Sequence, residues 1–296
     1  MHRSSLVDAA LALMAIALGA CTGVMDETDD SATVDAIVSG ARETGYTAVG
    51  YLRRADMGVM CNATLVAPRV ALTAAHCVYD NRPAHDLRMG FGDVGTQPTI
   101  RVKRVIVHPR YTEAAGIAHD VAVLILERDG PVTPALLGST AVGDDLRVIG
   151  YGRTFDAAFE DKRSYVHLRK SALVSVLSFD RSEVRTVGVT GGACRGDSGT
   201  GLFLDATNTL VAIHSRSPES DDYACGIGVE KLATTTEGES AFFRAALSCN
   251  DDSLLTCGST LDPACIFRCA DYAASPGDNA ARWICGEDQC LRMRGM

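Results

Sequence analysis

The sequence predicts an all-β fold, and three observations carry this prediction. From Ile37 onward, short apolar runs such as 100–107, 121–126 and 210–213 are separated by Gly, Pro and Asp, and runs of this length and spacing are typical of an antiparallel barrel or sandwich. The segment 239–247 is the best helix candidate, because its apolar residues have helical spacing. The 296 residues are 47% hydrophobic and 22% charged, an ordinary composition that can build a large core.

The net charge excludes one class of function. The chain has 28 basic and 37 acidic residues, which gives a formal charge of −9. Nucleic-acid-binding proteins normally present a basic face, so we expect no nucleic-acid partner. The sequence also has no Gly-rich phosphate loop, and we expect no cofactor.

Residues 1–20 have the pattern of an export signal. A short basic start precedes the apolar run 9–18, which is shorter than the roughly 20 residues that span a bilayer but suits a signal-peptide core. The run ends in Leu18-Gly19-Ala20-Cys21, which resembles the lipobox of bacterial lipoproteins, whose cysteine carries the lipid. We therefore expect a lipid on Cys21 and a place in the bacterial cell envelope. Plain secretion and a retained membrane anchor are the alternatives.

The cysteines support this interpretation and mark a domain boundary. Eleven is an odd number, and exported proteins rarely leave one thiol unpaired, so a lipid on Cys21 fits the count. Six of the other ten lie in 249–296, a segment too short for a core of its own, where we expect three disulfides of open connectivity. This module is either a stabilising cap or a binding module for substrate or the cell surface.

The predicted organisation therefore has four parts. After the signal peptide 1–20, residues 21–36 are acidic and without periodicity, which predicts a solvated tether or propeptide. The main β domain covers 37–248, and the Cys-rich module covers 249–296.

Three segments carry the side chains of a serine-dependent catalyst. Segment 72–77 presents His76 after a strand, Asp120 stands at the mouth of an apolar strand, and Ser198 is flanked by glycines within Cys194-Arg195-Gly196-Asp197-Ser198-Gly199. A serine hydroxyl is a weak nucleophile, so it needs a base that takes its proton and a third group that orients the base. Flanking glycines let backbone N–H groups approach a developing oxyanion.

In order and flanking residues, these segments resemble the trypsin/chymotrypsin-like serine endopeptidases over 37–248. The resemblance implies two six-stranded antiparallel β-barrels with a C-terminal helix, and hydrolysis of protein or peptide substrates through an acyl-enzyme. It also implies that Ser198 is the nucleophile, His76 the general base and then acid, and Asp120 the orienting carboxylate. The N–H groups of Gly196 and Ser198 would form the oxyanion hole.

The same resemblance implies two disulfides and one further serine. Cys61 would pair with Cys77 beside the base, and Cys194 with Cys225 beside the nucleophile. Ser215 matches the serine that borders the buried acid. A metal site is the alternative for the cysteines, but their spacings match no zinc pattern, so we expect no metal.

The resemblance also places the substrate pocket. In the family, the residue six positions before the nucleophile forms the base of this pocket, and here it is Gly192, followed by Ala193. Glycine cannot pair with a substrate Arg or Lys, so we expect a small or medium apolar residue before the scissile bond. Ser215 and Ser217 would border the entrance, and an acid from 221–222 is a possible further occupant.

Ile37-Val38-Ser39-Gly40 resembles the N-terminus that this family exposes when a zymogen is cut. By resemblance, the new ammonium of Ile37 pairs with Asp197, and an uncut chain leaves the oxyanion loop unformed. Because Ala36 precedes the cut, the activating protease should prefer small residues. The cut would also release the domain from a lipid on Cys21. Alternatively, Ile37 only begins the first strand and the tethered protein is active.

Two other classes of function stay open: a catalytically inactive, protease-shaped binding lipoprotein and a structural surface lipoprotein. All three catalytic residues are present, which favours the enzyme. The Asn62-Ala63-Thr64 sequon has no assigned role. The remaining histidines of the mature chain are expected to have surface or core roles: His85, His108, His119, His167 and His214.

Overall fold

The computed structural model describes residues 37–79, 84–108, 110–112, 118–153, 168–180, 182–218, 224–240, 242–243, 284–286 and 289–291. The expectations about residues 1–36, including lipidation of Cys21, lie outside these residues, as do those about most of 249–296. In that last segment the structure describes only an antiparallel pair, β15 (Ile284–Gly286) and β16 (Gln289–Leu291). Within the described ranges, no helix is long and apolar enough to cross a membrane.

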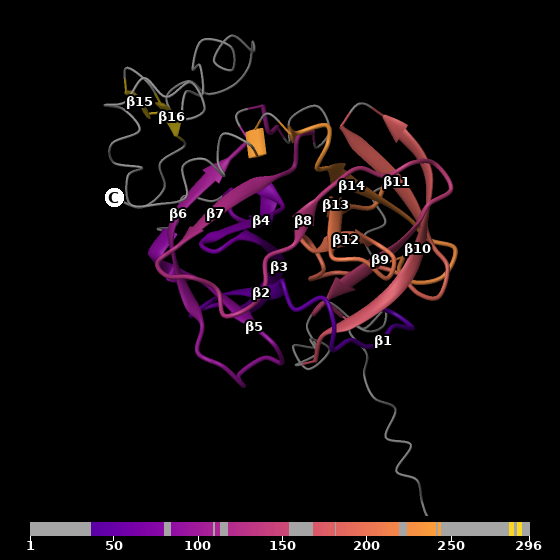
Figure 1. Cartoon of the computed structure of the whole chain (residues 1–296), viewed down its shortest axis with the longest axis horizontal. Coiled ribbons are helices and arrows are strands. Elements are labelled where there is room, and N and C mark those ends of the chain that lie inside the picture. The colour runs from indigo at the N-terminus through magenta and orange to yellow at the C-terminus, as the bar shows by residue number, and fades with distance from the viewer. Residues whose placement is uncertain are drawn as a thin grey trace, which may run out of the picture. The chain divides into compact units, whose positions relative to one another are not determined.

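The first half of the main domain is a closed antiparallel barrel of six strands in the order β2-β3-β4-β7-β6-β5 (Figure 1). In β6, buried and exposed residues alternate at the start of the strand, because successive side chains point to opposite faces. Strand β7 is buried along its whole length. The strands are β2 (Val49–Arg54), β3 (Gly58–Ala67), β4 (Val70–Thr73), β5 (Leu87–Phe91), β6 (Ile100–Val107) and β7 (Ala122–Leu126), with short 3-10 turns η1 (Ala75–Cys77) and η2 (Ala84–Asp86).

The second half forms a barrel of the same size. Its six strands run in the order β10-β11-β14-β13-β12-β9, and the antiparallel pairing of β9 with β10 closes it. The prediction of two six-stranded antiparallel barrels is therefore confirmed. The strands are β9 (Asp145–Gly150), β10 (Lys170–Asp180), β11 (Glu183–Gly188), β12 (Gly201–Leu204), β13 (Thr209–Arg216) and β14 (Glu230–Thr235), with β1 (Ala41–Arg42) added to β10 and β8 (Leu136–Leu137) added to β13.

The predicted helix over 239–247 is not seen as a bounded helix among the described residues. Ser240, Phe242 and Phe243 have helical backbone, and the rest of the segment after Phe243 lies outside the described part. Phe242 and Phe243 are buried in the apolar cluster of the first barrel, and the ring of Phe242 lies 4.8 Å from that of His108. The chain therefore returns from the second barrel to pack against the first.

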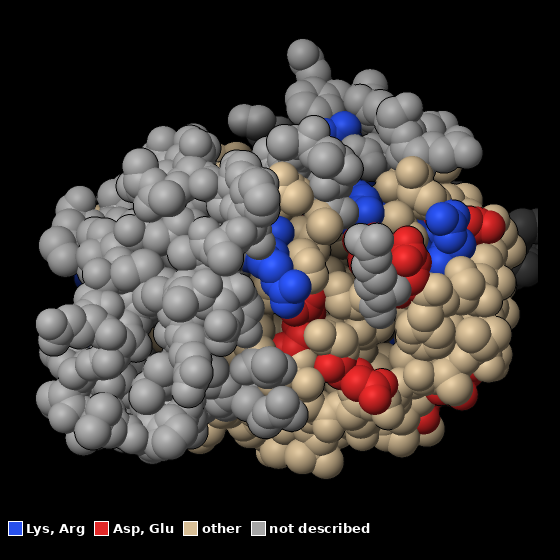
Figure 2. Space-filling view, turned by 90° about the horizontal axis from the view of Figure 1, so that it is seen from above, with Lys and Arg blue, Asp and Glu red and all other residues tan. Residues whose placement is uncertain are grey.

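Charged side chains at the surface pair locally. Figure 2 shows basic and acidic groups interspersed over the described part of one face. On the second barrel, Arg185 bonds Glu230 across β11 and β14 at 2.6 Å. Arg216 bonds Glu183 through both terminal guanidinium nitrogens, at 2.5 and 3.1 Å. The exposed Arg185–Glu230 pair adds little stability, whereas the two-point contact with Glu183 fixes the direction of the partly buried Arg216 side chain.

Candidate active site

His76 and Asp120 meet because their strands are neighbours. β4 pairs with β7, with Thr73 opposite Ala122, so the turn after β4 and the residues before β7 lie at the same edge of the barrel. His76 Nδ1 lies 2.7 Å from Asp120 Oδ2, and the His76 backbone N–H donates to Oδ1 at 2.9 Å. The two contacts fix the imidazole in both position and direction.

Asp120 is fully buried, and its carboxylate accepts hydrogen bonds from His76 and from one further side chain. The Ser215 hydroxyl donates to its Oδ2 at 2.5 Å, at the place expected from the sequence. Burial alone would raise the pKa of Asp120, but the neighbouring His76 and the hydrogen bonds from His76 and Ser215 outweigh it and hold that pKa below its usual value. An ionised Asp120 favours the His76 tautomer with its proton on Nδ1, in which Nε2 carries the lone pair that can accept a proton.

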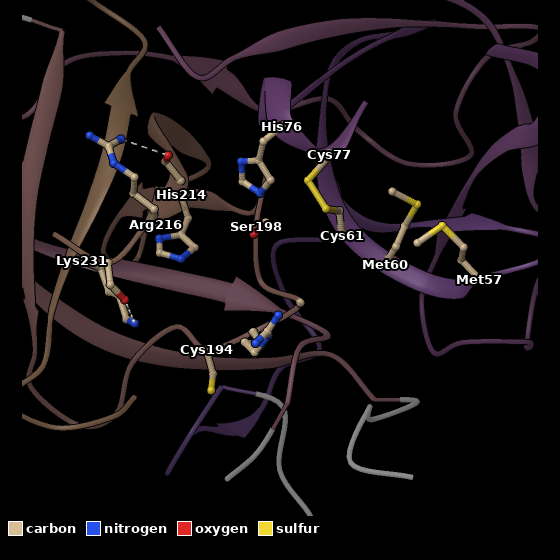
Figure 3. Close-up of a pocket in the computed structure, with 14 residues that line it drawn as sticks. Met57, Met60, Cys61, His76, Cys77, Cys194, Ser198, His214, Arg216 and Lys231 are labelled. Atoms are coloured by element: carbon tan, nitrogen blue, oxygen red, sulfur yellow. Dashed lines mark hydrogen bonds between the residues drawn. A yellow bond between two sulfur atoms is a disulfide. The ribbon is translucent and has the colours of Figure 1, made fainter. Parts of the chain in front are cut away.

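Ser198 stands in a loop whose backbone needs glycine. Gly196 and Gly199 have φ values of 92° and 79°, and a side chain at Gly199 would collide with Thr73. Figure 3 shows the imidazole of His76 directed toward Ser198. Among the described residues, the backbone N–H groups of Gly196 and Ser198 have no hydrogen-bond acceptor. Two donors therefore remain available beside the nucleophile.

Asn62 ties this loop to the first barrel, a role that the sequence alone does not reveal. It lies in β3 and is fully buried. Its backbone N–H donates to the Ser198 carbonyl at 2.8 Å, and its Nδ2 donates to the Gly196 carbonyl at 2.9 Å. Its Oδ1 accepts the Tyr151 N–H at 3.2 Å. A buried amide with both ends engaged cannot accept a glycan, so the sequon at Asn62 is incidental.

Both disulfides expected from the resemblance are present. Cys61–Cys77 joins β3 to the turn that carries His76, and Cys194–Cys225 braces the nucleophile loop. The first spans a sequence separation of 16 residues, worth roughly 3 kcal/mol in the chain-entropy model. Cys61, His76 and Cys77 lie close enough to hold a metal ion, but both sulfurs belong to the disulfide and offer no thiolate.

Ile37 and Asp197 lie together inside the second barrel. Both are fully buried, and a side chain at Gly150 would collide with the Asp197 carboxylate and touch Ile37. Asp197 accepts the N–H groups of Gly152 and Cys194, at 2.8 and 2.9 Å, but no cationic group among the described residues donates to it. Burial raises the pKa of Asp197 to about 7. Among the described residues, the Asp197 carboxyl group therefore has no hydrogen-bonded counter-ion.

The expected pocket residues divide between two cavities. Ser215 and Ser217 line the cavity of about 410 Å³ onto which the nucleophile and base open (Figure 3). Gly192 and Ala193 line a separate inner cavity of about 10 Å³. The backbone of Gly226 packs against Gly192, so the space that the small residue leaves is already filled.

Two residues that the sequence did not single out stand between these cavities. His214 and Lys231 line both of them. Lys231 is buried, and its ammonium group donates to Ser217 Oγ at 2.6 Å and to the Ala224 carbonyl at 2.7 Å. Burial, assisted by the nearby Lys231 charge, lowers the pKa of His214 to about 3, so this imidazole is neutral. The residues between the two cavities are therefore polar rather than apolar.

A second cluster lies beside the acid. Glu239 accepts from His108 Nε2 at 2.9 Å and from His119 Nδ1 at 2.5 Å, and the two rings stack at 4.7 Å with 14° between their planes. Burial would raise the pKa of Glu239, but both hydrogen bonds hold it well below its usual range. The lone pairs of nearly parallel rings cannot converge on one cation, so the cluster is a hydrogen-bonded clamp. This clamp holds His119, the residue before Asp120, against Glu239, which follows the last strand of the second barrel.

Comparison with known proteins gives the same picture. Residues 37–233 match the family model described as Trypsin. Serine protease SP24D of Anopheles gambiae is 30% identical over 171 residues, which cover 52% of this chain and 60% of that protein. The trypsin of Saccharopolyspora erythraea is 31% identical over 179 residues, which cover 52% of this chain and 74% of that protein. Chymotrypsin-like elastase family member 1 of Bos taurus is 28% identical over 199 residues, with coverages of 59% and 73%.

A solved structure shares the fold. Neuropsin, a serine protease expressed in the limbic system of mouse brain, superposes with a TM-score of 0.58 at 21% identity, over 71% of this chain and all of that one. At this identity the likeness concerns the fold alone. The family model covers all strands of both barrels except the last two residues of β14, together with all three candidate catalytic residues, and it decides the assignment. The chain belongs to the trypsin family of serine proteases.

Proposed function

We propose that the protein is an exported serine endopeptidase that cleaves peptide bonds through an acyl-enzyme. One observation carries this proposal. The Asp120–His76 pair lies at the same cavity as Ser198, beside the backbone N–H groups of Gly196 and Ser198, which have no acceptor among the described residues. The Ser198 hydroxyl attacks the substrate carbonyl while His76 Nε2 takes its proton, and the N–H groups of Gly196 and Ser198 stabilise the oxyanion. His76 then protonates the leaving amine, and water resolves the acyl-enzyme by the same steps.

Covalent labelling by an organophosphorus serine probe tests this proposal. The N-terminally processed protein should be labelled, and Ser198→Ala should abolish the labelling. Ser178→Ala is a matched control, because Ser178 is exposed on β10 and does not line the active-site cavity. If the processed protein is not labelled, the inactive binding protein is the correct reading.

Activation by a cut before Ile37 is the second part of the proposal. Ile37 has a φ of 60°, which is strained for a β-branched residue because its side chain crowds the backbone. A cut before Ile37 removes the preceding carbonyl and with it this strain. It also creates an ammonium group at the residue that packs beside Asp197, whose carboxylate accepts no hydrogen bond from a cationic group among the described residues. Both effects favour the cleaved form.

Export and anchoring complete the proposal. The two disulfides suit an oxidising compartment outside the cytosol. A lipid on Cys21 would hold the precursor at the envelope, and the activating protease would then both switch on and release the domain. N-terminal sequencing of the active enzyme, together with detergent partitioning, tests this coupling. Active protein that is still lipid-anchored, with 21–36 intact, would refute it.

A further inference from the structure

Asp120 stands on a turn whose backbone is strained at the residue before it. The Val121 N–H donates to the His119 carbonyl at 2.8 Å, so residues 119–121 form a three-residue turn with Asp120 at its centre. His119 has a φ of 50°, in the left-handed region that is uncommon for residues other than glycine. If His119 relaxed to a negative φ, the backbone of Asp120 would rotate and carry its carboxylate away from His76. The surrounding structure must therefore hold His119 in this conformation.

The imidazole of His119 is held at its edge and at its face. At the edge, Nδ1 donates to Glu239 Oε1 at 2.5 Å. At the face, the ring stacks on that of His108, with 4.7 Å between the ring centres and 14° between the planes. The two contacts together fix both the position and the orientation of the ring, and the ring in turn limits the backbone that carries it.

The groups that hold His119 are themselves fixed. The Arg110 backbone N–H donates to His108 Nδ1 at 3.2 Å, which leaves the proton of a neutral His108 on Nε2. Burial lowers the pKa of His108 and so keeps this ring neutral. His108 Nε2 donates to Glu239 Oε2 at 2.9 Å, so each carboxylate oxygen of Glu239 accepts one imidazole N–H. Glu239 is buried and its side chain is only 3% exposed, so water competes little for these bonds.

Residues of the second barrel also hold Asp120 directly. The Ser215 hydroxyl donates to its Oδ2 at 2.5 Å, and the Thr234 hydroxyl donates to its backbone carbonyl at 3.4 Å. Both contacts act on Asp120 itself. Glu239, which follows β14, acts on the residue before it and thus on the direction in which the chain enters Asp120.

From this arrangement we infer that Glu239 is a positioning residue for catalysis: by holding His119 in its left-handed conformation, it keeps the Asp120 carboxylate aligned with His76. The inference rests on the proposed function and gives the clamp a role beyond stability. Glu239 does not line the active-site cavity, so its loss should lower kcat and leave KM nearly unchanged.

Two substitutions at one position separate backbone conformation from side-chain contacts. His119→Ala and His119→Gly both delete the imidazole with its bond to Glu239 and its stack on His108. Glycine adopts a φ of 50° freely, whereas alanine does not. We therefore expect kcat to fall about 10–100-fold in His119→Ala and less than about fivefold in His119→Gly.

Glu239→Ala tests the other end of the clamp. It should lower kcat about tenfold and change KM less than about twofold. Combined with His119→Gly, it should cost no more than His119→Gly alone, because the turn then no longer needs the clamp. Glu237→Ala is the matched control, since it removes an exposed carboxylate two positions earlier and should leave kcat unchanged.

Labelling to completion with the organophosphorus serine probe counts the competent sites, and kcat is expressed per site. A role in stability alone would change the unfolding free energy of these variants but not this kcat. Wild-type kcat in Glu239→Ala and His119→Ala, or an equal loss in His119→Ala and His119→Gly, overturns the inference and leaves the proposed function intact. A processed protein that is never labelled overturns the proposed function itself. If Glu239→Ala fails to fold, the two variants at the partly exposed His119 still decide the matter.

Discussion

The buried carboxyl of Asp197 predicts that activation changes how stability depends on pH. In the uncut chain, burial raises its pKa to about 7, against roughly 3.9 in an unfolded chain. The folded state therefore holds this proton more tightly than the unfolded state, so the contribution to stability is complete below about pH 4 and is lost as the pH rises toward 7. Well below pH 7 each pH unit removes about 1.36 kcal/mol, and the loss per unit falls near pH 7 because the carboxyl is half ionised there. The uncut chain should therefore lose about 2.3 kcal/mol between pH 5 and pH 7.

Cleavage before Ile37 should abolish this loss. An ammonium group beside Asp197 favours the ionised carboxylate and lowers its pKa, and then no proton is released as the pH rises. The comparison uses Ser198→Ala to prevent turnover, with the recognition sequence of a specific endopeptidase placed directly before Ile37. The uncut and cut forms of this one protein share every other titrating side chain, so the difference between them isolates Asp197.

Urea unfolding of both forms at pH 5 and pH 7 measures the effect. The uncut form should lose about 2.3 kcal/mol more than the cut form, or roughly 5–9 °C in melting temperature for a domain of this size. The same pH dependence in both forms would refute the reasoning, because it would mean that Asp197 already has a counter-ion in the precursor or that the cut supplies none.

Three further substitutions test the site. Asp120→Asn should keep the fold but lower kcat about 10⁴-fold, because an amide stabilises the wrong tautomer of His76; near-normal turnover would remove Asp120 from its role. Asn62→Ala should lower kcat by about 10–100-fold with little change in KM, because it frees the Gly196 carbonyl and loosens the oxyanion donors, and steady-state kinetics measures this split. Glu239→Gln should lower stability by about 1–3 kcal/mol at pH 7. Because the pKa of Glu239 is depressed by folding, its ionised form stabilises the native state above about pH 4, so the wild-type advantage over the variant should shrink as the pH falls below that value, as chemical unfolding at pH 6 and pH 3.5 would show.

Much of the framework follows from local sequence. Strand length and spacing indicated an antiparallel barrel or sandwich, and the resemblance supplied the two barrels and both disulfide pairings. The segments around His76, Asp120 and Ser198 are recognisable because each is defined by its immediate neighbours in the chain. The structure brings the three together because strand pairing brings the segments before β7 and after β4 to one edge, and the second barrel docks against that edge.

The rest depends on residues that are distant in sequence. Lys231 enters the pocket from β14, 39 positions after Gly192, and nothing near either residue signals that the two share a cavity. Asn62 is separated from Gly196 by 134 positions, and Glu239 from His119 by 120. A single sequence gives residue types but not their partners, so Asn62 is interpreted as an incidental sequon and His108 and His119 are expected only to have surface or core roles.

The contacts of Asn62 have a consequence for how such an enzyme loses activity. The base and its acid belong to one barrel and the nucleophile to the other, and the amide of Asn62 is a direct fastening between them. Each barrel closes its own sheet, so a small rotation of one against the other would leave the strand pairing of both intact while separating Ser198 from His76. Catalysis in this chain thus resembles a property of a dimer whose two subunits happen to be covalently joined. Heat or denaturant should therefore abolish activity by moving one barrel against the other before either barrel unfolds.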